Sequence, residues 1–205
     1  MSDRIIICIS REYGSGGQEI GEKLAAKLGI KCYNKVLIDN QTAQDYGVPA
    51  DIIATFGEKK PISWIAQQSP LRSEYYDTVF YVINDDIFNL QSKTIKKIAS
   101  KESCVIVGRV ADEILKDDPD MLSIFIHSKM ENRIKRVMET ENKSFENAER
   151  ELKLLDKSRA KYYNHYSNRK WGVCDSYDLS ISSSKFGIDG VVAIINKFIN
   201  ELKDV

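Results

Sequence analysis

The sequence predicts an α/β fold in which five parallel strands alternate with helices. Short apolar runs rich in β-branched residues suit strands that are buried on both faces. Longer segments with helical periodicity separate these runs, and a repeated strand-then-helix order implies a parallel sheet with right-handed crossovers. The 205 residues are enough for one sizeable core. Because no internal repeat, low-complexity tract or linker is visible, we expect residues 1–205 to form a single domain.

Each predicted element rests on its own pattern. The predicted strands are Ile5–Ile9, a weaker run at Ile30–Tyr33, Cys104–Val107, Leu122–Ile126 and Leu179–Ile181. The predicted helices are Gln18–Leu28, Val36–Tyr46, Asp86–Ala99, Val110–Leu115, Met130–Met138, Glu146–Tyr166 and Gly190–Leu202. In the third helix, Asn84 or Asp85 can accept hydrogen bonds from the first backbone donors. Its apolar residues from Ile87 to Ile98 fall on roughly one face, so this helix is part of the scaffold.

Composition argues against several classes of partner. Thirty basic residues balance thirty acidic ones, so no global field favours nucleic acid or an anionic membrane. The four cysteines are far apart in the sequence and only two histidines are present, which argues against a zinc site. The apolar run at the N-terminus is too brief for a signal peptide, and no stretch approaches membrane-spanning length. We therefore expect a cytoplasmic protein that binds neither nucleic acid nor membrane.

The segment from Pro49 to Tyr81 is the least regular part of the chain. It holds three prolines and reads as loop interrupted by short helix. One interpretation is an insertion that covers a substrate, over about residues 48–82. The alternative is an ordinary helical hairpin on the surface.

A glycine-rich turn links the first predicted strand to the first helix. In "REYGSGGQEIG", glycines allow the turn, backbone N–H groups point inward, and the helix N-terminus favours a bound anion. The dinucleotide fingerprint fails, because Glu19 stands where its third glycine belongs. The Walker pattern also fails, because Arg11, Gly17 and Gln18 occupy its first-glycine, lysine and hydroxyl positions. Arg11 and Ser15 nevertheless place a cation and a hydroxyl beside the turn, which favours a phosphate site over a turn that is merely structural.

Four segments together resemble the cytidylate kinase-like family, a branch of the P-loop nucleoside monophosphate kinases. They are "ISREYGSGGQEIGEKLAAKLGI", "CVIVGRVADEIL", "ENRIKRVME" and "LDKSRAKYYNHYSNRKWG", and they span almost the whole chain. The resemblance implies a three-layer P-loop NTPase fold with the glycine-loop strand at the centre of the sheet. It also implies transfer of the γ-phosphoryl group of ATP, with Mg²⁺, to a pyrimidine nucleoside monophosphate or a related small acceptor.

On the donor side, the resemblance assigns the glycine loop to the ATP phosphates. Gly14, Ser15, Gly16, Gly17 and Gln18 would form the cradle that binds them. Arg11 is the candidate replacement for the absent lysine, because it lies in the same loop.

The same resemblance implies a helical lid over about residues 133–172. Its cations would neutralise charge during phosphoryl transfer, which depends mostly on positioning and electrostatics. Arg133, slightly preferred to Arg136, and Arg169 are the catalytic candidates, with Lys170 as a further cation. Any of these could instead be a solvated helix residue.

On the acceptor side, relatives end a strand in Gly-Arg-Asp, which matches Gly108 and Arg109. The aspartate of that motif is Val110 here, so its contact is missing or comes from Asp112. Alternatively, Arg109 makes a structural ion pair.

A second acceptor motif of the relatives is an Asp-x-x-Arg pair. Asp156 and Arg159 match it and would share one helix face. In relatives, this pair contacts the cytosine and phosphate of the acceptor. Alternatively, the two residues form only a surface ion pair.

Two rival functions remain open at this point. Losing the lysine could convert the fold into a module that binds a nucleotide without turnover. The substitution at Val110 instead favours a kinase whose acceptor is not a nucleotide. The sequence leaves the oligomeric state undetermined.

Overall fold

The structure is a computed structural model that describes residues 4–55 and 74–203, with side chains at 4–54 and 84–202. Its centre is one parallel five-stranded sheet in the order β2-β3-β1-β4-β5. The strands are β1 Ile6–Arg11, β2 Lys31–Tyr33, β3 Cys104–Val107, β4 Met121–His127 and β5 Leu179–Ser182. All four strand pairs are parallel. The predicted fold class is therefore confirmed, with the glycine-loop strand in the centre.

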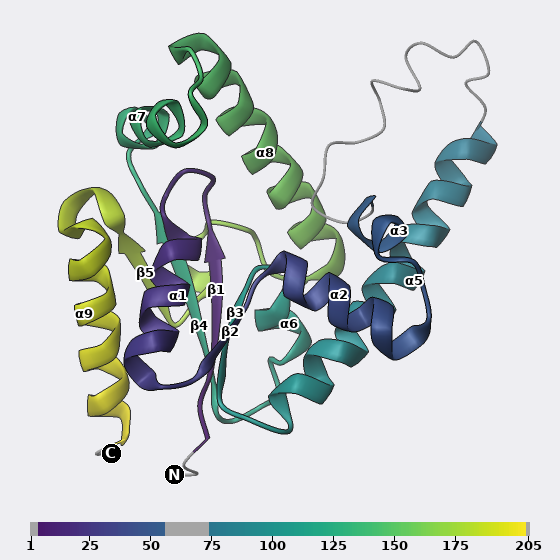
Figure 1. Cartoon of the computed structure of the whole chain (residues 1–205), viewed down its shortest axis with the longest axis horizontal. Coiled ribbons are helices and arrows are strands. Elements are labelled where there is room, and N and C mark those ends of the chain that lie inside the picture. The colour runs from purple at the N-terminus through teal and green to yellow at the C-terminus, as the bar shows by residue number, and fades with distance from the viewer. Residues whose placement is uncertain (1–3, 56–73, 204–205) are drawn as a thin grey trace.

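Helices cover both faces of the sheet and make three layers (Figure 1). On one face lie α1 Gly17–Leu28 and α9 Ser183–Lys203, and on the other lie α2 Lys35–Tyr46, α5 Glu74–Ala99 and α6 Ala111–Ile114. Successive residues of a strand point to opposite faces. Ile7 and Ile9 accordingly pack under α1 and α9, while Ile6 and Cys8 pack in the second core.

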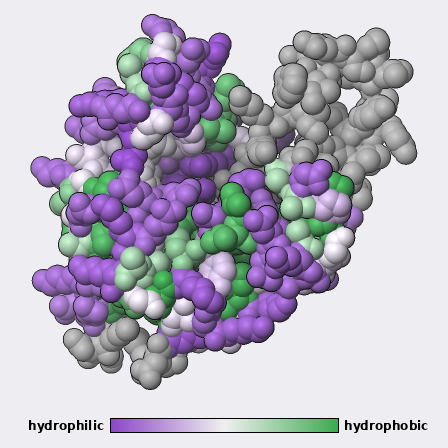
Figure 2. Space-filling view, in the orientation of Figure 1, coloured by the Kyte–Doolittle hydropathy of each residue, from purple (hydrophilic) through white to green (hydrophobic). Residues whose placement is uncertain are grey.

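Three further helices lie around the carboxyl ends of the strands or beside α2. The pair α7 Met130–Glu141 and α8 Phe145–Tyr166 rises above the glycine loop, and α3 Ala50–Thr55 packs near α2 (Figure 1). A short 3₁₀ turn, η1 Cys174–Ser176, precedes β5. Hydrophilic side chains cover most of the face shown in Figure 2, and apolar ones occur there in small groups.

Element boundaries differ from expectation mainly at two helices. Helix α5 begins at Glu74, well before the predicted Asp86. Helix α9 begins at Ser183 rather than Gly190, because two helical segments are joined across Gly187, whose φ of 68° is not helical. Residues 56–73 of the insertion expected at 48–82 lie outside the described residues, and this insertion, like the lid, stays a prediction. In the described part of the chain, no helix combines the length and apolar character needed to cross a membrane.

Candidate active site

The glycine loop connects the carboxyl end of β1 to the N-terminus of α1, beneath α7 and α8 (Figure 1). Gly14 and Gly16 have φ values of 73° and 81°, a region that L side chains rarely adopt. A Cβ on Gly16 would also lie 2.3 Å from Cδ1 of Ile188. The first N–H groups of α1, beginning at Gly17, have no partner within the helix, so together with the helix dipole they form a site for an anion.

Arg11 and Gly17 meet at the base of this loop. A Cβ added to Gly17 would lie 2.5 Å from Cβ and 2.9 Å from Cγ of Arg11, and 3.5 Å from Cβ of Ile126. The stem of Arg11 therefore fills the space that any side chain at position 17 would need. The glycine at the lysine position and the arginine at the end of β1 are two parts of one arrangement.

The two side chains at the hydroxyl end of the loop have partners within the protein. Ser15 is buried and its Oγ donates to the carbonyl of Glu12 at 2.8 Å. Gln18 is exposed, and its Nε2 donates to Glu22 Oε1 at 3.0 Å. Within residues 4–55 and 74–203, no cluster of three His, Cys, Asp or Glu side chains is arranged to hold a metal ion.

The structure separates the two arginines of α7. Arg136 is one-third exposed, with 33% of its side chain accessible, and pairs with Glu19 of α1. Its Cζ lies 3.5 Å from the position of a Cβ on Gly16, so its guanidinium lies at the glycine loop. Arg133 is buried and forms an ion pair with Asp156 as well as a 3.4 Å contact from Nε to Glu12 Oε2. Sequence reasoning slightly preferred Arg133, whereas Arg136 lies closer to the helix N-terminus.

Helix α8 places Asp156 and Arg159 against the backbone of the glycine loop. Oδ1 of Asp156 accepts from the N–H of Tyr13 at 2.8 Å. Nη1 of Arg159 donates to the carbonyl of Arg11 at 3.0 Å, and its Cζ lies 5.4 Å from the centroid of the Tyr13 ring. The Tyr13 hydroxyl donates to Glu141. Burial, and to a smaller extent this hydrogen bond, raises the pKa of Tyr13 to about 12. Tyr13 thus connects the loop to α7 and α8, a role that the sequence patterns did not indicate.

Arg109 lies at the carboxyl end of β3 in an unusual backbone segment. Gly108, Arg109 and Val110 have φ values of 84°, 60° and 55°. A β-branched residue such as Val110 is rarely found there, and strain of this kind gathers at functional sites. The Arg109 side chain is 1% exposed, and its Nη2 donates to both carboxylate oxygens of Asp39 at 2.8 and 2.6 Å.

Asp39 gathers several polar groups around Arg109. Oδ2 of Asp39 lies 3.0 Å from Nζ of Lys35 on the same helix. Nε2 of Gln91, on α5, donates to Oδ1 of Asp39 at 2.8 Å. The sequence patterns indicated none of the three residues, because polar residues that meet through the packing of α2 and α5 form no local motif.

Of the remaining candidates, Arg169 lies just after α8 and Asp112 lies on α6. Nη1 of Arg169 donates to the carbonyl of Ser176 at 3.0 Å, and its Nε lies 3.9 Å from Glu113. Asp112 is buried and accepts from the hydroxyl of Tyr163 at 2.6 Å. Burial raises the pKa of Asp112, although the hydrogen bond from Tyr163 opposes this shift.

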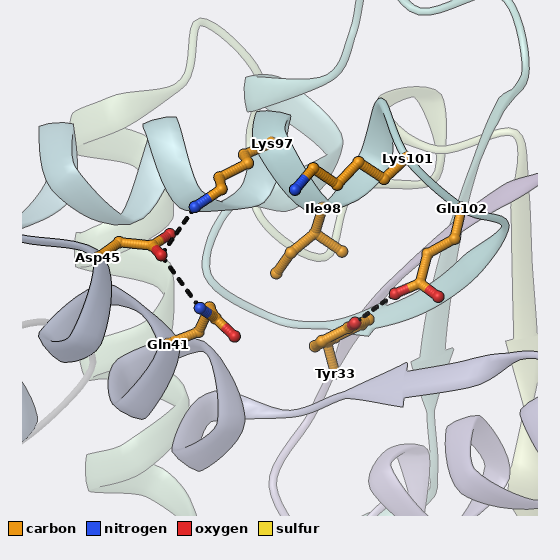
Figure 3. A pocket seen from close by; sticks show the side chains of 7 residues that line it. All are labelled: Tyr33, Gln41, Asp45, Lys97, Ile98, Lys101 and Glu102. Atoms are coloured by element: carbon orange, nitrogen blue, oxygen red, sulfur yellow. Dashed lines mark hydrogen bonds and ion pairs between the residues drawn. The ribbon is translucent and has the colours of Figure 1, made fainter.

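A separate cavity of about 210 Å³ lies between β2, α2 and α5. Figure 3 shows Gln41 and Lys97 both bonded to Asp45, and Tyr33 bonded to Glu102. None of the loop residues lines it, so it is distinct from the candidate active site.

Comparison with known proteins identifies the family. A sequence model of the cytidylate kinase-like family matches residues 6–185. The chain belongs to this family. Cytidylate kinases of Archaeoglobus fulgidus and Pyrococcus horikoshii are each 27% identical to it, with 96% and 99% of this chain and 96% and 92% of theirs aligned.

Two solved structures have folds similar to that of this chain. An uncharacterized protein from Eubacterium ventriosum is 35% identical, with a TM-score of 0.74 over 96% of this chain and 99% of that one. The shikimate kinase from Acinetobacter baumannii in complex with shikimate has a TM-score of 0.54 at 16% identity, over 98% of this chain and 96% of that one. This member of the cytidylate kinase-like family therefore has a P-loop kinase fold.

Proposed function

We propose that the protein is an ATP-dependent phosphotransferase that uses Arg11 in place of the P-loop lysine. The observation that carries this proposal is the contact between Arg11 and Gly17. A protein that had simply lost the P-loop lysine would not need the Arg11 side chain to pack against residue 17, the lysine position. Here the space is filled from the end of β1, by a residue that brings its own cation. Family membership supports a kinase, and this contact supports a kinase that has kept a charge at its donor site.

The donor side follows from the loop and its neighbours. Backbone donors of Gly14, Ser15, Gly16, Gly17 and Gln18 would bind the ATP phosphates, at the positive end of the α1 dipole. Arg136 and Arg11 would neutralise charge that develops on the transferred group, with Arg133 and Arg169 as further candidates.

The residues present are compatible with magnesium that arrives on the nucleotide. Mg²⁺ keeps several waters and binds largely through substrate phosphates rather than a protein cage. Ser15 Oγ keeps its acceptor lone pairs and would be the loop's ligand for the ion. When bound, the ion supplies Lewis-acid neutralisation of the phosphate oxygens.

The acceptor would bind at the carboxyl ends of β1 and β3, where open parallel sheets bind their ligands. Arg109 is the residue that the resemblance assigns there, because it lies at the carboxyl end of β3 in the left-handed turn of residues 108–110, and Asp39 holds its buried guanidinium. Cytidylate kinase relatives point to a pyrimidine nucleoside monophosphate as the first acceptor to test. The resemblance also assigns Asp156 and Arg159 to this acceptor.

A nucleotide-binding module without turnover is the second candidate. It is favoured by Gly17 and Gln18, which leave the loop without its usual lysine and hydroxyl. ADP production from ATP and Mg²⁺ with CMP, dCMP, UMP and a panel of small acceptors, beside ATP calorimetry, separates the two. Acceptor-dependent turnover is the expected result. Tight ATP binding with no turnover on any acceptor would replace the kinase with the binding module.

A further inference from the structure

Asp156 already uses both carboxylate oxygens within the protein. Oδ1 accepts the backbone N–H of Tyr13 at 2.8 Å, and Oδ2 pairs with the guanidinium of Arg133. Arg133 is 4% exposed, and 15% of the Asp156 side chain is accessible. Turning Asp156 toward an acceptor would leave the backbone N–H of Tyr13 without this acceptor and would remove one of the two carboxylates, beside Glu12, that face the buried guanidinium of Arg133, which is unfavourable.

Arg159 bonds the backbone from which Arg11 projects. Its Nη1 donates to the Arg11 carbonyl at 3.0 Å, while its guanidinium lies over the Tyr13 ring, 5.4 Å from Cζ to the centroid. A bond to this carbonyl fixes the last peptide of β1. It therefore helps to set the direction in which the Arg11 side chain leaves the strand.

Tyr13 is held at every polar group. Its N–H donates to Asp156, its carbonyl accepts from Nη1 of Arg133 at 3.2 Å, and its hydroxyl donates to Glu141 at 2.5 Å. These contacts come from both α7 and α8, so the lid helices hold the loop immediately before Gly14.

We infer that Asp156 and Arg159 are positioning residues of the phosphate loop, acting through Tyr13 and the backbone of Arg11, rather than contacts to the acceptor. They maintain the loop in the conformation that presents its backbone donors and the Arg11 cation to donor phosphates. This inference rests on the proposed binding of ATP to the loop. It reassigns two residues from the acceptor to the donor side.

Assignment of the two residues to the loop predicts weaker ATP binding in the variants, whereas assignment to the acceptor site predicts weaker CMP binding. Calorimetry measures both affinities without turnover. Asp156→Asn and Arg159→Met are compared with Glu149→Gln, a carboxylate-to-amide change at an α8 residue whose partner is Lys153. ATP with Mg²⁺ and CMP are titrated separately, and circular dichroism checks folding. Asp156→Asn weakens the ion pair with Arg133 and could unfold the chain. Arg159→Met, which leaves that ion pair intact, then still tests the inference.

If the two residues position the loop, each variant weakens ATP binding about tenfold, the scale of one lost charge-assisted hydrogen bond. CMP binding then changes by less than about twofold, and the Michaelis constant for ATP rises while that for CMP does not. Glu149→Gln leaves both affinities unchanged. Weaker CMP binding with intact ATP binding would overturn the inference and restore the acceptor assignment.

Failure of the proposed function gives a different pattern. A wild-type protein that binds ATP but neither binds nor phosphorylates CMP would refute CMP as acceptor, while the ATP affinities of the variants would still decide the inference. Unchanged ATP affinity in both folded variants would overturn it whatever the acceptor. A wild-type protein that does not bind ATP would overturn both claims.

Discussion

Arg11 and Gly17 share one space at the base of the glycine loop: a Cβ on Gly17 would lie 2.5 Å from the Cβ of Arg11. Tetrahedral side-chain carbons cannot approach this closely. Arginine at the end of β1 therefore requires glycine at the start of α1, and the missing lysine is explained by packing as well as by chemistry.

The close contact predicts that Gly17→Ala destabilises the protein, even though alanine favours a helix more than glycine does. Overpacking of a rigid site costs about 1–3 kcal/mol, so the free energy of unfolding should fall by that amount. Urea denaturation measures the loss. In an Arg11→Gly background, which removes both clashing carbons, the same substitution should be neutral or stabilising. An equal loss in both backgrounds would contradict the proposed contact.

Arg136 and Arg133 are expected to respond differently to replacement by methionine. Arg136 is partly exposed beside Gly16, so Arg136→Met should reduce kcat by roughly a hundredfold with little change in melting temperature. Arg133→Met would leave Asp156 without its buried partner and should cost about 3–5 kcal/mol of stability. Lys135→Met, at an exposed position of the same helix, is the control. A stable Arg133 variant with a large loss of kcat would return the catalytic assignment to Arg133.

Removing Asp39 should destabilise the protein strongly, because Arg109 is almost fully buried against it. Breaking one partner of a buried ion pair costs about 3–5 kcal/mol, and Asp39→Asn is expected to fall in this range. Asp45→Asn on the same helix is the matched control, since Lys97 is its half-exposed partner (Figure 3). We expect a much smaller loss there. Similar unfolding free energies for the two variants would show that the Arg109 pair adds little.

Asp112 makes a pH-dependent contribution to stability. Burial raises its pKa in the folded state, so the folded protein holds a proton that the unfolded chain releases above the ordinary aspartate pKa. The associated stability is present below the unfolded pKa and is lost as pH rises through the raised folded pKa. Asp112→Asn removes this loss and keeps an acceptor for Tyr163. The unfolding free energy of the variant, minus that of wild type, should therefore grow with pH, and a constant difference would contradict the shift.

Patterns local in sequence predicted most of the fold. The apolar runs of β1, β3 and β4 have no polar alternation, because both faces of these strands are covered by helices. The long α5 began earlier than expected, since a predicted start at residue 86 relied on the capping side chains of Asn84 and Asp85. The helical segment before Gly187 was likewise missed, because the non-helical φ of Gly187, 68°, separates it from the longer segment that contains the predicted start at Gly190.

The candidate site was only partly accessible to sequence reasoning. The glycine loop and Arg109 were predicted as site residues because each follows a strand directly, where parallel sheets bind ligands. Asp39 and Gln91 were missed, since the contacts of Asp39 with Gln91 and with Arg109 join residues 52 and 70 positions apart through packing alone. The loop contacts of Asp156 and Arg159 depend on how α8 lies over β1. Spacing within the helix predicts that the two residues share a face, but not what that face contacts.

The most direct test of the account is the rate of acceptor-dependent ADP formation when the cation is moved from position 11 to position 17. Arg11→Ala should lower kcat by roughly a hundredfold to a thousandfold without unfolding the chain, the effect of losing one preorganised cation. Arg11→Gly should lose a similar factor, and adding Gly17→Lys to it should recover part of the rate, since the new side chain enters the vacated space. Recovery in the double variant is the result predicted here. An unchanged rate in Arg11→Ala would contradict the claim that Arg11 replaces the lysine.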